Sequence, residues 1–436
     1  MGKRVLLCLA HMSGKEIDFI KEAFEDNWVV PLGPNVNGFE EDLKKYLEAT
    51  VCESEEKAKC EISNNDLYGP LTPYVAALSA GTAAVHLALA ACGVGEGDEV
   101  MVQSFTFCAS SHPVRYLGAT PVFVDSERDT WNMDPEVLDL AIADRVETTG
   151  KKPKAIIVVH LYGMPAKMAE IARVAAKWNI PIVEDAAEAF GSEYACRRCG
   201  TFGLYGVLSF NGNKMITTSG GGALVCRDEK TQKHVMFLAT QARESYPYYQ
   251  HETIGYNYRM SNICAGIGRG QMTIIDEHVA HHRRVQELYK NMLADVEGIT
   301  VHDNPSPEFN SNFWLSTITI DPTLKIKGEE KAYAEASSSP VGGVGAVTNG
   351  DNKPLHTSCE PNKNVEALRL ALDNENIESR PLWKPMHLQP VYSSCPAYPN
   401  GVSESLFKTG LCLPAGPWVT DEDVARIVRT IKNNII

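Results

Sequence analysis

Short apolar runs alternate with longer segments of helical periodicity between residues 81 and 230. The runs that we expect to form strands are 99–103, 120–124, 155–160, 180–184, 206–210 and 222–226. The helices expected between them are 82–92, a segment around 110–117, and 167–178. Strand, helix and strand at this spacing form a βαβ unit with a right-handed crossover, and runs that are apolar on both faces imply a sheet covered on both sides. The pattern therefore predicts an α/β fold built around a buried sheet.

Polar side chains follow several of these apolar runs. His160, Asp185, Ser209 and Lys214 all fall at or just after the end of an expected strand. In open α/β sheets, ligands bind outside the carboxyl ends of the strands. We therefore expect these four side chains to converge on one crevice.

The pattern changes from about residue 280 onward. The features expected there are a charged helix at 281–294, a polar Gly/Ser-rich stretch near 336–352 and a final helix at 421–435. This change predicts a larger domain over residues 1–280 and a smaller one over 281–436. We expect the first 40 residues to pack near the crevice and residues 53–72 to form an inserted surface loop.

The net charge of -14 narrows the possible partners. Nucleic acids and anionic membrane surfaces are bound through basic patches, so this charge argues against both. No apolar run approaches the roughly 20 residues that span a bilayer, and the N-terminal stretch lacks the pattern of a signal peptide. We therefore expect a cytoplasmic protein. An anionic ligand would need a local concentration of backbone N–H groups, lysine and arginine.

The 12 cysteines are scattered, and most lie in apolar segments that are typical of reduced, buried thiols. One pair, Cys196 and Cys199, has the spacing of metal ligands. A structural zinc site needs about four ligands, and no second pair of this kind accompanies the first. We therefore expect an exposed surface turn at 196–199 and no metal.

Small residues open one of the expected helices, in the sequence SAGTAA (79–84). Such a start lets backbone N–H groups and the hydroxyl of Thr82 approach a phosphate, aided by the helix dipole. Small residues also precede many helices that bind nothing, so this motif alone does not establish a site.

Three further motifs carry candidate chemistry. Asp185 ends a strand in VEDAAE (183–188), where it either caps a following helix or pairs with a bound cationic group. Lys214 ends SFNGNK (209–214), before TTSGGG (217–222). A lysine in a loop is usually only solvated, but this one lies between an apolar strand and a Gly-rich return strand, where its long side chain can reach inward and act as a nucleophile. GYNYRMSN (255–262) is a polar and aromatic loop before an Ala/Gly-rich helix, which is unusual for a mere connection.

Taken in this order, the motifs GTAA, EDAAEAFGS, SFNGNK and GYNYRMSN resemble the DegT/DnrJ/StrS family of sugar aminotransferases. The resemblance extends from PLGPNVNGFEEDL (31–43) to ESRPLWKPMH (378–387). It implies the aspartate-aminotransferase fold (PLP fold type I), which has a large domain with a mixed, mostly parallel seven-stranded sheet and a smaller C-terminal α/β domain. The chain is similar in particular to the transaminases that form UDP-N-acetylbacillosamine, through HLYG, TTSGGG, TQARE and RPLWKPMH.

The resemblance implies pyridoxal 5'-phosphate (PLP) as the cofactor, and it assigns two catalytic residues. Lys214 is implied to hold PLP as a Schiff base, and Asp185 to pair with the pyridine nitrogen. At about 3 Å and an effective dielectric near 20, such a pairing is worth roughly 5 kcal/mol, which keeps the ring protonated as an electron sink.

The resemblance also implies residues that bind the cofactor and the substrate. Thr82, Ala83 and Ser209 are implied to hold the phosphate, joined by Asn257 of the neighbouring subunit. Phe107 is implied to stack on the ring, and Glu188, at a position that is often Gln or His in the family, to lie near the PLP hydroxyl. The residues implied to meet the nucleotide-sugar are Trp28, Val29, Val30, Pro31, Arg380 and His387.

The implied reaction moves the amino group of L-glutamate to C4 of a UDP-linked 4-keto-6-deoxy-N-acetylhexosamine, in a homodimer with shared active sites. Lys214 would serve as nucleophile and as general base. A sugar dehydratase of the same family is disfavoured because those enzymes replace the lysine with histidine. A PLP-binding regulatory protein would need an added DNA-binding or sensory module, which neither the length nor the acidic charge of the chain supports. An aminotransferase for another keto-sugar, GDP- or dTDP-linked or with a 3-keto group, stays open.

Overall fold

The computed structural model describes residues 3–49, 72–333 and 359–436. Residues 53–71 of the expected surface loop and the whole polar stretch at 336–352 lie outside the described residues.

The centre of the molecule is an eight-stranded sheet in the order β1-β9-β8-β5-β4-β2-β3-β14. Its strands are β1 (Tyr74–Leu78), β2 (Glu99–Gln103), β3 (Thr120–Val124), β4 (Ala155–Val159), β5 (Ile182–Asp185), β8 (Tyr205–Ser209), β9 (Gly222–Cys226) and β14 (Ala397–Tyr398). β9 alone runs in the opposite direction to the other strands, so the sheet is mixed and mostly parallel as expected. The expected number of seven strands is wrong, because β14 returns from the C-terminal part of the chain and pairs in parallel with β3.

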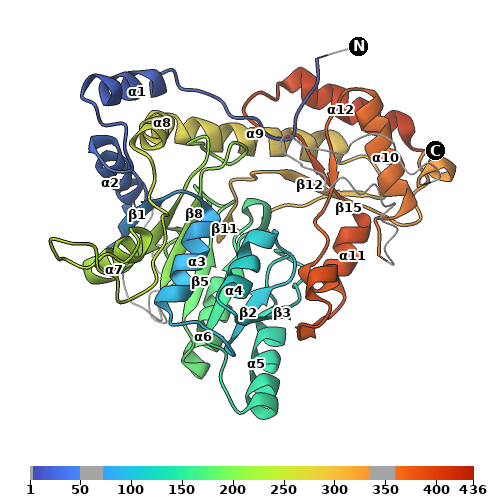
Figure 1. Cartoon of the computed structure of the whole chain (residues 1–436). Helices are drawn as coiled ribbons and strands as arrows, with labels where there is room; N and C mark the ends of the chain where they lie inside the picture. The colour runs from blue at the N-terminus through green and yellow to red at the C-terminus, as the bar shows by residue number, and fades with distance from the viewer. Residues whose placement is uncertain (1–2, 50–71, 334–358) are drawn as a thin grey trace.

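Helices cover both faces of this sheet, as the continuous apolar runs predict (Figure 1). Alternate residues of one strand enter different cores: Met101 packs in one cluster, and Val100 and Val102 pack in the other. The helices along the sheet are α2 (Pro34–Glu48), α3 (Gly81–Ala91), α4 (His112–Tyr116), α5 (Pro135–Thr149), α6 (Met168–Trp178) and α7 (Glu229–Ala239). The helix expected at 110–117 is shorter, because a separate 3-10 turn, η3 (Cys108–Ser110), precedes α4.

The C-terminal part has its own antiparallel sheet, in the order β10-β12-β15-β13. Its strands are β10 (Ile299–Val301), β12 (Ser316–Ile320), β13 (Arg380–Pro381) and β15 (Gly410–Leu413). The helices around it are α9 (Ile275–Leu293), α10 (Lys363–Asn374), α11 (Val402–Thr409) and α12 (Asp421–Asn434). Val5 packs in the same core and bridges to Ile377, so the N-terminal end joins this part of the chain. The domain boundary predicted at residue 280 falls inside the continuous helix α9 and stays a prediction.

Smaller elements join these two parts. β11 (Phe309–Asn310) pairs with the hairpin of β6 (Glu193–Tyr194) and β7 (Arg197–Arg198). α1 (Glu16–Glu25) and α2 both pack on α8 (Asn262–Met272). Over the three described ranges, no helix is both long enough and apolar enough to cross a membrane.

Candidate active site

The start of α3 forms a cradle of backbone groups. Within the described residues no side chain caps this end of the helix. A Cβ atom on Gly81 would lie 2.9 Å from Ser209 Cβ, and one on Gly222 would lie 2.4 Å from the backbone nitrogen of Gly81. Glycine at these two positions lets the helix start approach the adjoining ends of β8 and β9. The N–H groups of the first turn, which includes Thr82 and Ala83, are therefore available to an anion beside Ser209.

Asp185 ends β5 as a buried carboxylate, 5% exposed. Ser110 Oγ donates a hydrogen bond to Asp185 Oδ2 at 2.7 Å, and the N–H of Ala187 donates to Oδ1 at 3.2 Å. Burial raises the pKa of the Asp185 carboxyl, while the bond from Ser110 and the nearby charge of Lys214 oppose that rise. The helix-cap interpretation is wrong, because residues 186–192 form turns and no helix. Asp185 is thus held in one orientation at a strand end.

Lys214 is turned inward rather than solvated, with 12% of its side chain exposed. Its Nζ donates to Glu188 Oε1 at 3.0 Å and lies 4.1 Å from the centroid of the Trp314 ring. Glu188 Oε2 accepts the backbone N–H of Tyr162 at 2.8 Å. Burial raises the pKa of the Glu188 carboxyl, and Lys214 is the strongest influence that lowers it. Because the charge of Lys214 acts on both Asp185 and Glu188, the structure brings these three residues together.

His160 does not join this group. Its Nε2 donates to Glu184 Oε1 at 2.8 Å, and its Nδ1 accepts the N–H of Ala166 at 2.9 Å. The backbone N–H of His160 donates to the carbonyl of Asp185 at 3.2 Å. Its ring, however, uses both nitrogens in a separate buried cluster, so the expected convergence of four strand-end side chains is wrong for the His160 ring.

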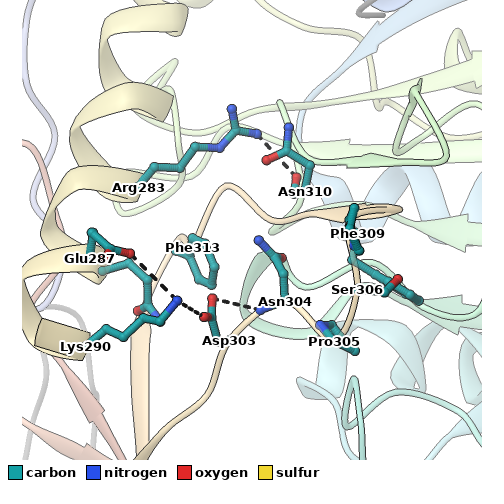
Figure 2. Close-up of a pocket in the computed structure, with 12 residues that line it drawn as sticks. Arg283, Glu287, Lys290, Asp303, Asn304, Pro305, Ser306, Phe309, Asn310 and Phe313 are labelled. Atoms are coloured by element: carbon teal, nitrogen blue, oxygen red, sulfur yellow. Dashed lines mark hydrogen bonds and ion pairs between the residues drawn. The ribbon is translucent and has the colours of Figure 1, made fainter. Parts of the chain in front are cut away.

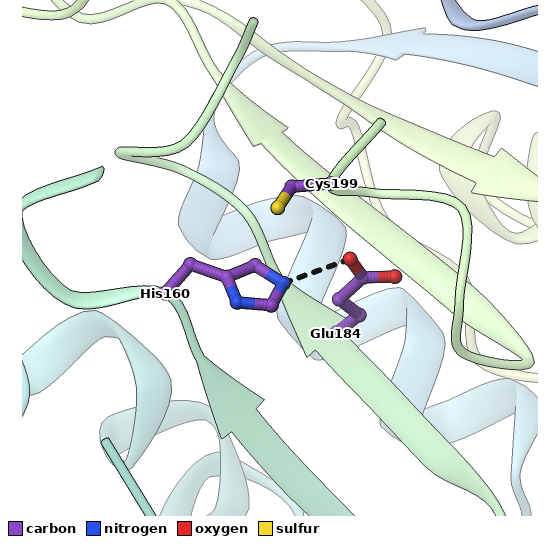
Figure 3. A group of neighbouring side chains, drawn as sticks. All are labelled: His160, Glu184 and Cys199. Carbon is purple, nitrogen blue, oxygen red and sulfur yellow. Dashed lines mark hydrogen bonds and ion pairs between the residues drawn. The ribbon is translucent and has the colours of Figure 1, made fainter. Parts of the chain in front are cut away.

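Cys199 lies beside His160 and Glu184 in that cluster (Figure 3). The ligand atoms of the three residues lie within 4.8 Å of one another. Glu184 also accepts three backbone N–H groups, from Gly200, Phe202 and Gly203, and burial raises the pKa of the Cys199 thiol well above its usual range. Glu184 thus accepts four hydrogen bonds from the protein, which tie the end of β5 to His160 and to the loop at 200–203.

The expected exposed turn at 196–199 is wrong for Cys199, which is fully buried. Cys196 lies at the turn between β6 and β7 and is disulfide-bonded. The two cysteines therefore have different environments and do not act as a ligand pair.

The segment before α2 exposes apolar side chains. Trp28, Val29 and Val30 are 38%, 47% and 41% exposed, and Pro31 is exposed as well. Asn262 holds this segment: its Nδ2 donates to the carbonyl of Trp28 at 3.0 Å, and its backbone N–H donates to the carbonyl of Val30 at 3.0 Å. The last residue of GYNYRMSN thus fixes the segment that is expected to meet the substrate.

Arg380 and His387, the other expected substrate residues, already have protein partners. Arg380 Nη2 lies 3.1 Å from Glu378 Oε1, with 31% of the arginine side chain exposed. His387 Nδ1 lies 2.6 Å from Ser104 Oγ, directly after β2, and burial lowers the pKa of His387. A ligand would have to share these side chains with the protein.

Phe107 lies next to the segment that carries His387. Its ring is 52% exposed and its centroid lies 5.4 Å from that of Trp383. The backbone N–H of Trp383 donates to the hydroxyl of Tyr162 at 2.9 Å. An exposed aromatic face is therefore available near Tyr162 and Glu188, where stacking on a ring was expected.

Asn257 is exposed in the loop before α8. The neighbouring side chains of Tyr256 and Tyr258 pack against His86 of α3, with ring centroids 4.7 Å and 5.9 Å from that of the histidine. The loop is thus anchored to the helix that begins with the phosphate cradle, and the contact of Asn257 with a neighbouring subunit stays a prediction.

Sequence reasoning missed three residues around this group: Ser110, Tyr162 and Trp314. Ser110 lies three residues after Phe107, and Tyr162 stands in HLYG, but roles are predicted only for Phe107 and His160 in these two stretches. The backbone of Tyr162 has φ +54, which is uncommon for a residue other than glycine. Local periodicity carries no signal for Trp314, because its contact with Lys214 joins two distant parts of the chain.

A cavity of about 560 Å³ lies elsewhere, between α9 and the segment from Asp303 to Phe313 (Figure 2). Its polar lining includes Arg283, Lys290 and Asn304. Lys290 forms ion pairs with Asp303 and Glu287. None of the expected site residues lines this cavity, so it is distinct from the group around Lys214.

Comparison with known proteins places this geometry in a family. The model of the DegT/DnrJ/EryC1/StrS aminotransferase family matches residues 65–336 and 353–432. The "Putative pyridoxal phosphate-dependent aminotransferase EpsN" of Bacillus subtilis (strain 168) is 41% identical over 438 residues, covering 99% of this chain and 96% of the relative. GDP-perosamine synthase of Escherichia coli O157:H7 is 32% identical over 420 residues, covering 96% of this chain and 95% of the relative.

A solved structure shares the architecture. The crystal structure of a DegT DnrJ EryC1 StrS aminotransferase from Brucella abortus matches with a TM-score of 0.77 at 26% identity, covering 96% of this chain and 95% of that one. The expected fold class is thereby confirmed, with the eighth strand as the one difference in the sheet.

Proposed function

The chain belongs to the DegT/DnrJ/EryC1/StrS aminotransferase family, and from that membership we propose that it moves the amino group of L-glutamate to C4 of a UDP-linked 4-keto-6-deoxy-N-acetylhexosamine. The family is one of sugar aminotransferases, and their cofactor is PLP. The proposed product is an amino sugar of the UDP-N-acetylbacillosamine type for glycan biosynthesis. PLP, when bound, supplies the electron sink that stabilises negative charge on carbon during amino transfer.

The residues of the site fit this cofactor. The uncapped start of α3, with Gly81 and Gly222 leaving space beside Ser209, offers N–H groups to a phosphate. Asp185 offers a buried carboxylate to a protonated ring nitrogen, and Phe107 offers an exposed aromatic face. We propose that these residues hold the cofactor together with Thr82, Ala83, Glu188 and Lys214.

Two side chains carry the proposed chemistry. Lys214 attaches the cofactor through Nζ and carries protons at the reacting carbon, because its amine is buried and its long side chain can move. Asp185 keeps the pyridine nitrogen protonated, and Ser110 fixes the orientation of its carboxylate. Glu188 serves as the partner of the Lys214 ammonium.

The inward orientation of Lys214 is the observation that carries this proposal. A solvated lysine would not stand 3.0 Å from a buried carboxylate. The presence of this lysine also disfavours the sugar dehydratase alternative, because those enzymes have histidine in place of the Schiff-base lysine.

A second candidate substrate is a GDP-linked keto-sugar. GDP-perosamine synthase of Escherichia coli O157:H7 is similar over nearly the whole chain. UDP selectivity rests on the resemblance of the RPLWKPMH segment, in which Arg380 offers a forked, permanently charged donor set that suits phosphate.

A substrate panel tests the proposal. Full-length protein is incubated with L-glutamate and one keto-sugar at a time: UDP-linked 4-keto-6-deoxy-N-acetylglucosamine, GDP-linked and dTDP-linked 4-keto sugars, and a 3-keto sugar. Formation of 2-oxoglutarate and the mass of the amino sugar are measured, with Lys214→Ala as background. A clear preference for the UDP-linked 4-keto sugar supports the proposal. Preference for another member refutes the UDP assignment while the aminotransferase activity stands.

We further propose that the working unit is a homodimer in the cytoplasm. Asn257 supports a shared site, because it is exposed on a loop anchored to α3 and so is open to a second subunit.

A further inference from the structure

Trp314 contacts the amine of Lys214 although the two residues are far apart in the sequence. The Nζ atom of Lys214 lies 4.1 Å from the centroid of the Trp314 ring, which is 3% exposed. A cation near an aromatic face is attracted by the ring quadrupole, and more strongly where water is excluded. The indole N–H of Trp314 also donates to the carbonyl of Asn213 at 2.6 Å. One side chain thus contacts both the end of the lysine and the backbone directly before it.

The turn at residues 311–314 is also tied to the loop that carries Glu188. Asn312, which is fully buried, accepts the backbone N–H of Trp314 through Oδ1 at 2.8 Å. Its Nδ2 donates to the backbone carbonyl of Glu188 at 2.9 Å. A single amide side chain therefore links the residue that contacts the amine of Lys214 to the residue that supplies its carboxylate.

Two further contacts make this turn rigid. A Cβ atom on Gly163 would lie 1.9 Å from Asn312 Oδ1, so the amide packs directly against the loop after β4. The ring Nδ1 of His282, on α9, donates to the carbonyl of Phe313 at 3.2 Å. Burial lowers the pKa of His282 to about 3, so this ring is neutral. Phe313 has φ +49, an uncommon value for a bulky residue that persists only where surrounding contacts enforce it.

We infer that Trp314 is a positioning residue for Lys214. The Trp314 ring and the Glu188 carboxylate confine the lysine side chain. The indole N–H of Trp314 also fixes the backbone at Asn213, directly before Lys214. A lysine has several rotatable bonds, so an unconfined amine spends most of its time away from the position where it can react. This inference rests on the proposed role of Lys214 as the residue that attaches the cofactor.

The rate of cofactor attachment tests the inference. Full-length protein is stripped of cofactor and mixed with PLP, and attachment is followed by absorbance. The rate is measured at a pH high enough that it no longer rises with pH. Under that condition the attraction of the ring for a protonated amine does not affect the rate. Trp314→Leu removes the ring and the indole N–H, and Trp314→Phe keeps an aromatic face. We expect attachment to slow by roughly 10-fold or more in the leucine variant and by a smaller factor in the phenylalanine variant.

Two comparisons separate positioning from general damage. The affinity for pyridoxamine phosphate, which lacks the aldehyde and cannot bond to Lys214, should stay within about 2-fold of wild type in both variants. Trp178→Phe makes the same chemical change on α6, where the indole bonds to Asp139, and should leave the attachment rate unchanged. Wild-type attachment in Trp314→Leu would overturn the inference. An equal loss of pyridoxamine phosphate affinity would also overturn it, by showing a purely structural role.

The failure of this inference is distinguishable from the failure of the proposed function. Reductive trapping in the wild type, followed by peptide mapping, shows independently whether Lys214 attaches the cofactor. A label on Lys214 together with unchanged rates in Trp314→Leu would refute only the role of Trp314.

Discussion

The Nζ atom of Lys214 lies 3.0 Å from Oε1 of Glu188, and the two side chains are 12% and 4% exposed. Burying two charges costs desolvation energy. Replacing only one partner therefore destabilises the fold by more than the net contribution of the pair, because the other charge is left buried without a partner. Burial raises the pKa of the Glu188 carboxyl, and Lys214 is the main influence that lowers it. The pair therefore links the protonation of the site to the stability of the fold.

Replacing Lys214 with alanine should make stability fall more steeply with rising pH. Without the ammonium, burial raises the pKa of Glu188 further above its unfolded value. The folded protein then binds the extra proton, so the free energy of unfolding falls as pH rises above the unfolded pKa. Because the carboxyl can stay protonated at low pH, we expect little loss at pH 5 and a loss of about 3 kcal/mol by pH 8. Urea unfolding of cofactor-free protein at both pH values measures this difference. The double variant Lys214→Ala/Glu188→Gln should lose the extra slope, and an unchanged slope in the double variant would show that Glu188 is not its source.

Replacing Asp185 with asparagine should spare PLP binding and lower turnover by at least about 100-fold, since a neutral amide cannot keep the pyridine nitrogen protonated. The amide oxygen can keep the bond from the N–H of Ala187, and the amide N–H can donate to Ser110 Oγ instead, so the fold should persist. Steady-state kinetics and PLP titration measure the two effects. Asp139→Asn, on the surface of α5, is the matched control. Near-normal turnover in Asp185→Asn would reduce Asp185 to a turn-forming residue.

The sequence predicts the sheet better than it predicts the site. The apolar runs that became β2, β3 and β9 were located to the residue, because each strand is buried on both faces and bounded by polar or glycine residues. The strand β14 was not predicted, because its two residues, Ala397 and Tyr398, form a strand only by pairing with β3.

Within the site, motif order identified Lys214 and Asp185, but the side-chain directions needed the structure. His160 follows a strand as Asp185 ends one, yet it bonds to Glu184 in a separate cluster. The contact of Trp314 with Lys214 depends on how the C-terminal part docks on the central sheet, which local sequence patterns do not encode.

Mixing two inactive variants should restore activity if the sites are shared between subunits. In a dimer of Lys214→Ala and Asn257→Asp chains, one site carries both lesions and the other carries neither. Activity is measured after subunit exchange has been confirmed, and it should approach one active site per mixed dimer. An absence of recovery would mean that Asn257 serves the cofactor of its own chain.

Replacing Arg380 with lysine should raise the KM for the sugar nucleotide more than the KM for glutamate. The guanidinium, which now pairs with Glu378 and is partly exposed, can form two parallel bonds to a phosphate that an ammonium cannot. A loss confined to binding raises KM by roughly 10-fold with kcat little changed. Arg173→Lys on α6 is the control. Equal changes in both KM values would place Arg380 outside the nucleotide-sugar site.

The attachment of the cofactor to Lys214 is the central claim, and reductive trapping tests it most directly. Purified full-length protein is treated with borohydride, digested, and the modified peptide is identified by mass spectrometry. The account predicts that the label lies on Lys214, and that Lys214→Ala protein loses both the label and the yellow absorbance while it stays folded. A label on any other lysine would contradict the account.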